Sequence, residues 1–255
     1  MMDVGKPVAV FTLGRFAVVK GGQPLRFATK TPRKPLELLQ ALIALGGRSV
    51  CAEQLALAVW PQQASDDPHN LMDNTVHRLR ALLGGRETVF VRNAKLSLND
   101  QQCWVDAWAF ECLGSRYAGA PSPATAAAAL QLYQGHFLQR EDSHPWLLPY
   151  RERLHQGLTR LLLRAGQGLE DAGQWAGATQ WYSRAVQADP LCEALHYRLM
   201  LCHQQAHQMA DALAAYQRCS ELLREVLGLP PSQATQALAR SLGRAAAARH
   251  AQRTG

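Results

Sequence analysis

Apolar and polar positions alternate near the start of the chain. Within residues 8–27 two turn signals, Leu13-Gly14-Arg15 and Gly21-Gly22, interrupt the alternation. A period of two is typical of a strand that buries one face, and glycine-rich turns join antiparallel strands. The pattern therefore predicts three short antiparallel strands.

The period becomes helical after Pro35. Apolar residues at positions 36, 38, 39, 42, 43 and 45 form one stripe, which the proline opens and Gly46-Gly47 closes. We expect Ser49 to cap a second helix that runs through Trp60, because Pro61 cannot continue it.

A third helix is predicted over residues 68–83. Its apolar residues lie at i, i+4, i+7 and i+11, which places them on one buried stripe: Met72, Val76, Leu79 and Leu83. Gly84-Gly85 ends this helix. The strands Thr88–Arg92 and Lys95–Leu98 follow it, with Asn93-Ala94 at the turn.

From about Trp104 onward the signals are helical, with almost no alternation of the β type. Asp106 can cap a helix that runs through Tyr117, and another helix is predicted at Ala124–Leu132. Residues 135–150 are predicted to form an irregular connection.

The remainder repeats with an offset of 34 residues, 157–190 against 191–224. The two copies match at several positions, among them Ala178/Ala212 and Tyr182/Tyr216, and Asp189-Pro190 closes the first copy. This spacing is typical of tetratricopeptide (TPR) repeats, in which the alanine permits close helix contact and the tyrosine packs between units. Two stacked helical hairpins are predicted, followed by a helix to about Leu242.

These elements together predict a mainly α protein. Strands, three helices and a hairpin in this order describe an α+β winged helix-turn-helix with an extra N-terminal antiparallel sheet, over residues 6–103. An all-α TPR-like domain is expected over 104–242, and a frayed basic tail over 243–255.

Composition narrows the class of protein. The 255 residues are 47% hydrophobic and 18% charged, which suits a folded chain. No run of 18 apolar residues and no secretory signal is visible, so neither a membrane span nor export is expected. The six cysteines form no CxxC pair, which favours reduced thiols in a cytoplasmic protein.

The net charge of +7 is shared along the chain. Residues 1–110 hold 13 Lys and Arg against 9 Asp and Glu, and residues 111–255 hold 14 against 11. This excess permits a nucleic-acid partner without proving one, because phosphate neutralisation needs basic groups gathered locally.

The polar side of the third helix carries side chains suited to a DNA groove. It presents Asn70, Asp73, Asn74, His77, Arg80 and Ala81, with Arg78 at the border. Asparagine can pair with adenine, and arginine can bind guanine or phosphate. Arg92 and Lys95 flank the tip of the hairpin that follows, where they can contact the DNA backbone or minor groove. The alternative for this helix is an ordinary solvated face.

A short basic run precedes the first helix. Lys30, Arg33 and Lys34 fall within "KTPRK". It is either a solvated loop or a phosphate clamp beside a helix N-terminus.

The order of these motifs resembles a known family. "FTLGRFAV", "RKPLELLQALIALGGRSVCAEQLALAVWP" and "NTVHRLRALLG" resemble the OmpR-type winged helix of the SARP regulators, named after antibiotic regulatory proteins. The segments "WVDAWAFE" and "HPWLLPYRERL", continuing into the repeats, resemble the bacterial transcriptional activator domain (BTAD) that accompanies it. The resemblance spans about residues 6–240.

The resemblance implies a transcriptional regulator. Helix 68–83 would be the recognition helix for promoter DNA, residues 88–98 the wing, and the 60–68 loop a region near RNA polymerase. It also implies homodimers or side-by-side binding on repeated sites. The TPR-like domain would then serve oligomerisation, signal input or partner contact. Asp73 places an acidic group on the groove side, so the sequence preference of relatives cannot be transferred.

Two other functions have weaker support. A zinc site formed by Cys192, His196, His203 and His207 is conceivable on one helix face, but the repeat places His207 at a turn. The chain contains no GxSxG, HExxH or GxxxxGK[ST] segment, so we expect neither catalytic residues nor a cofactor.

The main alternative is a TPR-type protein-interaction adaptor whose winged helix does not bind DNA. Charge distinguishes the two functions. A continuous basic surface over Arg80, Arg92, Lys95 and residues 30–34 favours DNA, whereas interruption by Asp66, Asp67 and Asp73 favours the adaptor.

Overall fold

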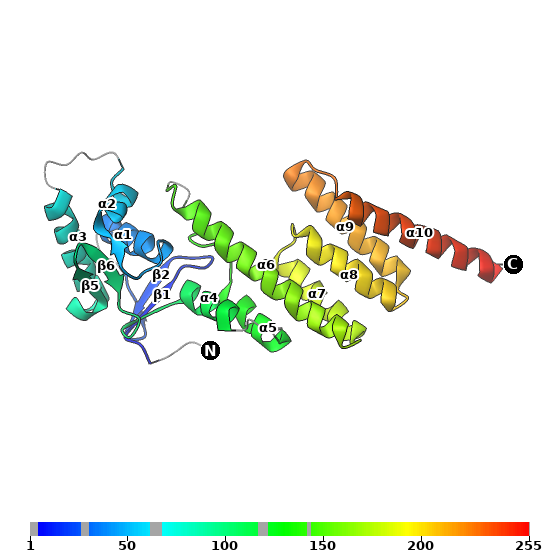
Figure 1. Cartoon of the computed structure of the whole chain (residues 1–255), viewed down its shortest axis with the longest axis horizontal. Coiled ribbons are helices and arrows are strands. Elements are labelled where there is room, and N and C mark those ends of the chain that lie inside the picture. Colours follow the sequence, from blue (N-terminus) through cyan, green and yellow to red (C-terminus); the bar gives the residue numbers. More distant parts are fainter. Residues whose placement is uncertain (1–4, 27–30, 62–67, 117–121, 142–143, 255) are drawn as a thin grey trace. The chain divides into compact units, whose positions relative to one another are not determined.

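The computed structural model describes residues 5–26, 31–61, 68–116, 122–141 and 144–254 (Figure 1). The chain forms two compact units. The first contains residues 1–113 and 131–156, and the second contains residues 114–130 and 157–255.

The N-terminal sheet has the three antiparallel strands that the alternation predicts, and one more. Its strands are β1 (Val8–Phe11), β2 (Ala17–Lys20), β3 (Gln23–Pro24) and β7 (Cys103–Val105), in the order β3-β2-β1-β7. Strand β7 runs parallel to β1, with Val8 opposite Cys103. The signals in the sequence are helical from about Trp104 onward and did not predict this strand, because a strand of three residues is too short to show a period of two.

The winged helix-turn-helix follows the predicted order. Its helices are α1 (Arg33–Ala44), α2 (Ala52–Val59) and α3 (Pro68–Leu83), and its sheet has the order β4-β6-β5, formed by β4 (Val50–Cys51), β6 (Lys95–Leu98) and β5 (Val89–Arg92). A short 3-10 helix, η1 (Arg86–Thr88), joins α3 to β5. Leu38, Leu39, Leu42 and Ile43 of α1 are completely buried at the centre of this domain.

The predicted helix cap at Ser49 is wrong. Ser49 has a φ of 52°, and its N–H donates to the hydroxyl of Ser97 over 2.8 Å. The next two residues pair with β6 as strand β4, so α2 begins only at Ala52. A hydrogen-bonding partner far along the chain overrides the local capping preference of serine.

Asp106 joins the end of β1 to the start of α4 (Asp106–Arg116). Its carboxylate accepts hydrogen bonds from the backbone N–H groups of Thr12, Leu13 and Ala107, over 2.7 to 2.9 Å. It also accepts a hydrogen bond from the Thr12 hydroxyl, over 2.6 Å. Burial raises the pKa of this carboxyl, although the hydrogen bonds act in the opposite direction.

The predicted helix end at Tyr117 lies outside the described residues. The helix predicted at Ala124–Leu132 is α5 (Pro123–Leu132).

Helices complete the chain: α6 (Leu147–Asp171), α7 (Trp175–Ala188), α8 (Glu193–Gln205), α9 (Met209–Leu227) and α10 (Gln233–Thr254). Helices α7, α8, α9 and α10 pack in succession (Figure 1). Gly173 and His207, one repeat apart, both turn with positive φ (67° and 61°). The helical hairpins of a TPR-like fold are therefore confirmed, and the last helix extends past the expected end at Leu242.

The repeat alanines and tyrosine pack as predicted. Ala178, Ala212 and Tyr182 have no exposed surface. The Tyr182 hydroxyl donates to Glu170 of α6 over 2.6 Å, and the Trp181 indole donates to the Leu162 carbonyl over 2.9 Å. These bonds hold α7 against α6.

No helix in the described part of the chain is long and apolar enough to cross a membrane.

Candidate nucleic-acid interface

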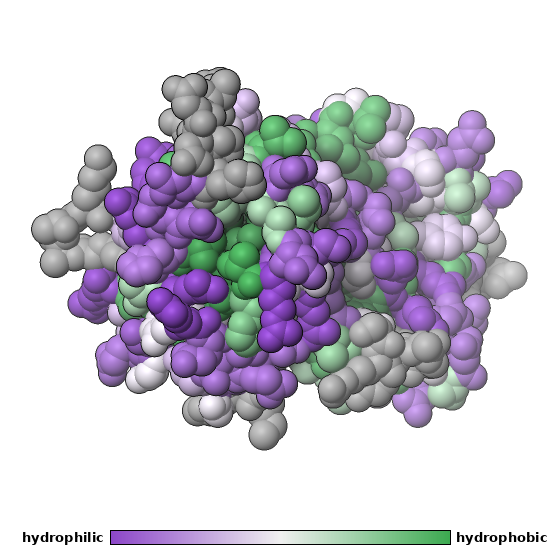
Figure 2. Space-filling view, turned by 60° about the vertical axis from the view of Figure 1, so that its left-hand side comes forward, coloured by the Kyte–Doolittle hydropathy of each residue, from purple (hydrophilic) through white to green (hydrophobic). Residues whose placement is uncertain are grey.

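Helix α3 separates into the two faces that its spacing predicts. Its apolar stripe is buried: Met72, Val76, Leu79 and Leu83 are each at most 6% exposed. The exposed residues of the described face are Asn70, Asp73, Asn74, His77, Arg78 and Ala81. Figure 2 turns the left-hand side of Figure 1 forward and shows mostly hydrophilic residues.

The two asparagines of this face orient each other. The Asn74 amide nitrogen donates to the Asn70 amide oxygen over 2.9 Å, across one helical turn. His77 lies one further turn along, at i+7 from Asn70. These three side chains therefore form one polar row on the outside of α3.

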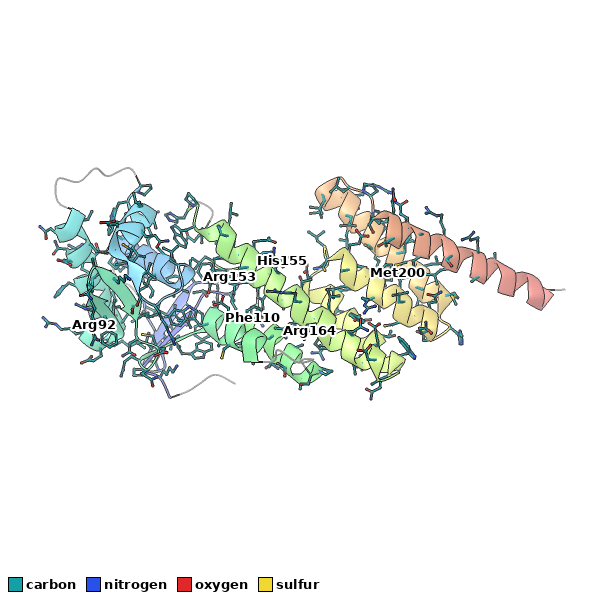
Figure 3. All side chains as sticks on the ribbon, in the orientation of Figure 1. Arg92, Phe110, Arg153, His155, Arg164 and Met200 are labelled. Atoms are coloured by element: carbon teal, nitrogen blue, oxygen red, sulfur yellow. The ribbon has the colours of Figure 1, made fainter. Side chains whose placement is uncertain are left out.

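The hairpin of β5 and β6 brings Arg92 and Lys95 together. They lie directly opposite each other across the strands, joined by Asn93 and Ala94, whose φ angles are 49° and 54°. Positive φ at both central residues is the geometry of a tight two-residue hairpin, and opposed residues share one face. Both cations are exposed at the hairpin (Figure 3 labels Arg92).

A hollow lies beside these cations. Its volume is about 480 Å³, and it is lined by Ser49, Phe90, Arg92, Asn93, Lys95 and Ser97. Phe90 is 41% exposed although it is a large apolar residue. We did not single it out from the sequence. Phe90 follows the buried Val89 and lies on the same face of β5 as Arg92, and this strand period of two is the signal that could have identified it.

Arg80 ties α3 to the hairpin. Its Nε and Nη2 atoms donate to the carbonyl oxygen of Val89, over 2.9 and 2.8 Å. Strand β5 is the edge strand of this sheet, so among the described strands none pairs with its outer carbonyl groups. The structure thus gives Arg80 an internal bond, and its contact with phosphate stays a prediction.

The basic residues before and at the start of α1 have different environments. Lys34 donates to the carbonyl oxygen of Val59, the last residue of α2, and pairs with Glu37, both over 2.7 Å. A positive charge at that position stabilises the C-terminal end of α2, because the helix dipole is negative there. Arg33 is exposed at the first position of α1. Lys30 lies outside the described residues, so a clamp formed by the whole run stays a prediction.

The charge of the interface is mixed. Asp73 is exposed on the same helix as Arg78, so an acidic group does interrupt the polar face. Asp66 and Asp67, the other carboxylates that favour an adaptor, lie outside the described residues. Among the cations predicted to contact DNA, the described ones that are exposed and have no internal bond to another described residue are Arg33, Arg78, Arg92 and Lys95.

The histidines of the conceivable zinc site have other environments. His196 is 1% exposed, with Nε2 2.9 Å from the Pro190 carbonyl oxygen, and Nδ1 of His203 lies 2.9 Å from the Gln208 amide oxygen. His207 occupies the turn between α8 and α9. Over the residues that are described, no group of three His, Cys, Asp or Glu could hold a metal ion.

The cysteines are free thiols. None of the six forms a disulfide, and burial raises the pKa of Cys103 and Cys202 to about 12 and that of Cys219 to about 11. A thiol must lose its proton to act as a ligand or nucleophile, so these side chains serve as small apolar residues.

Comparisons with known proteins identify the family. The bacterial transcriptional activator domain model matches residues 105–242, and no curated protein matches the sequence. Among solved structures, Mycobacterium tuberculosis EmbR in complex with a low-affinity phosphopeptide has a similar fold, with a TM-score of 0.66 at 21% identity. The match covers 94% of this chain and 65% of the EmbR chain. The chain therefore belongs to the bacterial transcriptional activator domain family, as its resemblance to SARP-type regulators predicts.

Proposed function

We propose that this chain is a transcriptional regulator that binds promoter DNA through α3 and the β5–β6 wing. One observation carries the proposal. The polar row on α3 and the paired cations Arg92 and Lys95 belong to elements that Arg80 bonds together. A helix followed by a rigidly attached basic hairpin can occupy a major groove while the hairpin contacts the adjacent backbone or minor groove.

The polar row would read bases. Asn70, Asn74 and His77 lie on the outer face of α3, and an asparagine amide can make two hydrogen bonds to adenine. The bond between Asn70 and Asn74 supports this assignment, because a pre-oriented amide loses less side-chain freedom on binding. Asp73 on this face would disfavour close approach of a phosphate, and it would accept a hydrogen bond from a cytosine amino group.

The exposed cations would hold the DNA backbone. Arg78, Arg92 and Lys95 are the best candidates, with Arg33 as a further one. Arg80 and Lys34 would contribute indirectly, by holding the wing and α2 in place. Lys30 remains a candidate by its sequence position.

Binding measurements on selected DNA test the proposal. Sites are first enriched from genomic fragments of the source organism with the purified full chain. Fluorescence anisotropy then gives the affinity of each variant as a function of salt. We expect Arg92→Ala and Lys95→Ala to weaken binding on all sequences, and each to lower the salt slope by about 0.9. Asn74→Ala should instead change the preference at one base pair, by about 1–3 kcal/mol.

Arg240→Ala is the matched control. Arg240 is an exposed arginine of α10, outside the proposed interface, so its replacement should leave both affinity and salt slope unchanged. Equal affinity of all folded variants would contradict this interface. Failure of the wild-type chain to enrich any DNA would favour the TPR-type adaptor. The adaptor is the second candidate because Asp73 is exposed on α3 and because Arg80 and Lys34 form internal bonds.

The α-helical domain would supply oligomerisation, signal input or partner contact, including contact with RNA polymerase. Repeat helices present extended surfaces of the kind that protein partners use. Analytical ultracentrifugation with and without DNA containing one or two copies of the enriched site distinguishes a preformed dimer from side-by-side binding. A chain that stays monomeric and binds two sites independently would contradict both arrangements.

A further inference from the structure

The first unit contains a second hollow, which includes no residue of α3 or the wing. Its volume is about 540 Å³, within the range of small-molecule sites, roughly 300–1,000 Å³. Its walls are the end of β1 with the following turn, Trp104 of β7, Asp106, and Gln131, Leu132 and Gln134 at and after the end of α5. The hollow thus joins segments that are far apart in the sequence.

One wall of the hollow is aromatic. The rings of Phe11 and Trp104 lie 5.5 Å apart at an angle of 61°, an edge-to-face arrangement. Leu13 and Leu132 add aliphatic surface beside them. A flat apolar body fits such a wall, because aromatic rings bind planar groups by stacking and edge contacts.

The rim of the hollow carries a cation. The Arg15 guanidinium carbon lies 5.9 Å from the centre of the Phe11 ring, and its side chain is exposed. Within the described part of the chain no carboxylate forms an ion pair with it. Gln131 is also exposed at this rim and offers an amide group.

Asp106 is the acidic group of the hollow, and its oxygens are occupied. They accept hydrogen bonds from Thr12, Leu13 and Ala107. This carboxylate therefore serves the junction of β1 and α4. Arg15 is left as the charged side chain that can bind a ligand.

We propose that this hollow binds a small organic anion with a flat apolar body, such as an aromatic carboxylate. Arg15 holds the carboxylate, because a guanidinium offers two parallel N–H donors that match its two oxygens. Phe11 and Trp104 contact the apolar body. The ligand would contact both the end of β1 and the segment that contains Gln131, Leu132 and Gln134, so this site is separate from the proposed DNA interface.

Calorimetric titration of the full chain with 2-naphthoate tests the site. We expect saturable binding to one site, weakened about tenfold in Arg15→Gln, which corresponds to about 1.4 kcal/mol. Gln131→Glu places a carboxylate at the rim and should weaken binding as well. The location is read from the ¹⁵N-indole signal of Trp104, assigned through Trp104→Phe, which should shift as the ligand is added.

Arg26→Gln is the matched control, because Arg26 is an exposed arginine that does not line the hollow. It should bind 2-naphthoate like the wild type. The neutral 2-naphthalenemethanol and the cationic 2-naphthylmethylamine should bind more weakly than the acid. The proposal is overturned by an absence of saturable binding, by equal affinity in Arg15→Gln, by stronger binding of the amine, or by an unchanged Trp104 signal.

Discussion

Gly47 lies against the indole ring of Trp108, so closely that a Cβ atom at position 47 would lie 1.9 Å from Cζ2 of the ring. Gly47 also has a φ of 71°, and its carbonyl oxygen accepts the N–H of Leu98 over 2.8 Å. This one glycine lets the turn after α1, strand β6 and helix α4 meet. The contact between the winged helix and the first helix after β7 depends on it.

Gly47→Ala should therefore destabilise the protein more than Gly46→Ala. Both positions have positive φ, but a Cβ at Gly46 meets no atom of the described residues within 4 Å. Backbone strain should cost about 1–3 kcal/mol in each variant, and displacement of Trp108 should add about 1–3 kcal/mol at Gly47 alone. Urea unfolding followed by circular dichroism measures the difference. Equal midpoints for the two variants would show that the indole moves without cost.

The repeat domain contains a similar pair in one helix. A Cβ at Gly166 would lie 2.2 Å from Cζ of Tyr182, whereas a Cβ at Gly168 meets no atom of the described part of the chain within 4 Å. Gly166→Ala should lower the free energy of unfolding by about 1–3 kcal/mol, because the added methyl group overpacks the contact with Tyr182. Gly168→Ala should raise the free energy of unfolding by up to about 1 kcal/mol, because alanine is the better helix former. Thermal unfolding of the two variants checks the opposite signs, and stabilisation of both would refute the predicted role of Tyr182.

Arg80→Ala tests the bond between α3 and the wing. The Val89 carbonyl loses two donors at the sheet edge, which should cost about 1–3 kcal/mol. Arg78→Ala removes an exposed arginine from the same helix and should change stability by no more than about 0.5 kcal/mol. Amide hydrogen exchange of β5 should accelerate in Arg80→Ala alone. Similar exchange rates in both variants would count against a structural role for Arg80.

The stability of the second unit should fall in weak acid because of His196. Burial, the largest cause, lowers its pKa below the ordinary value of 6.5, and none of the described residues forms a hydrogen bond with its buried Nδ1 atom. The neutral His196 makes its full contribution to the free energy of unfolding above pH 6.5. Below that pH the unfolded chain binds a proton that the folded chain does not, so the contribution is lost at up to about 1.4 kcal/mol per pH unit.

The pH dependence of unfolding in His196→Gln checks this prediction. The variant should lose part of the slope below pH 6.5 that the wild type shows, whereas His203→Gln, at a partly exposed position of the same helix, should retain it. Identical slopes in wild type and His196→Gln would exclude His196 as the origin.

Much of the fold follows from local pattern. The stripe of α3, the paired glycines after α1 and α3, and the Asn93-Ala94 turn were predicted because each depends on neighbours within a few residues. The repeat offset likewise predicted the buried Ala178, Ala212 and Tyr182. Strand β7 and the turn at Ser49 were missed, since their partners are remote segments of the chain.

The candidate site divides in the same way. The sequence by itself determined which side chains of α3 face solvent, except for Arg80, and where the wing cations lie, because helical and strand periods are local properties. Only the tertiary structure decided that Arg80 and Lys34 bond to Val89 and Val59, that Phe90 is left exposed, and that Phe11, Arg15 and Trp104 line one hollow. The physical reason is that a side chain's partner is set by which remote backbone and rings folding brings within bonding distance, and periodicity contains no information about that distance.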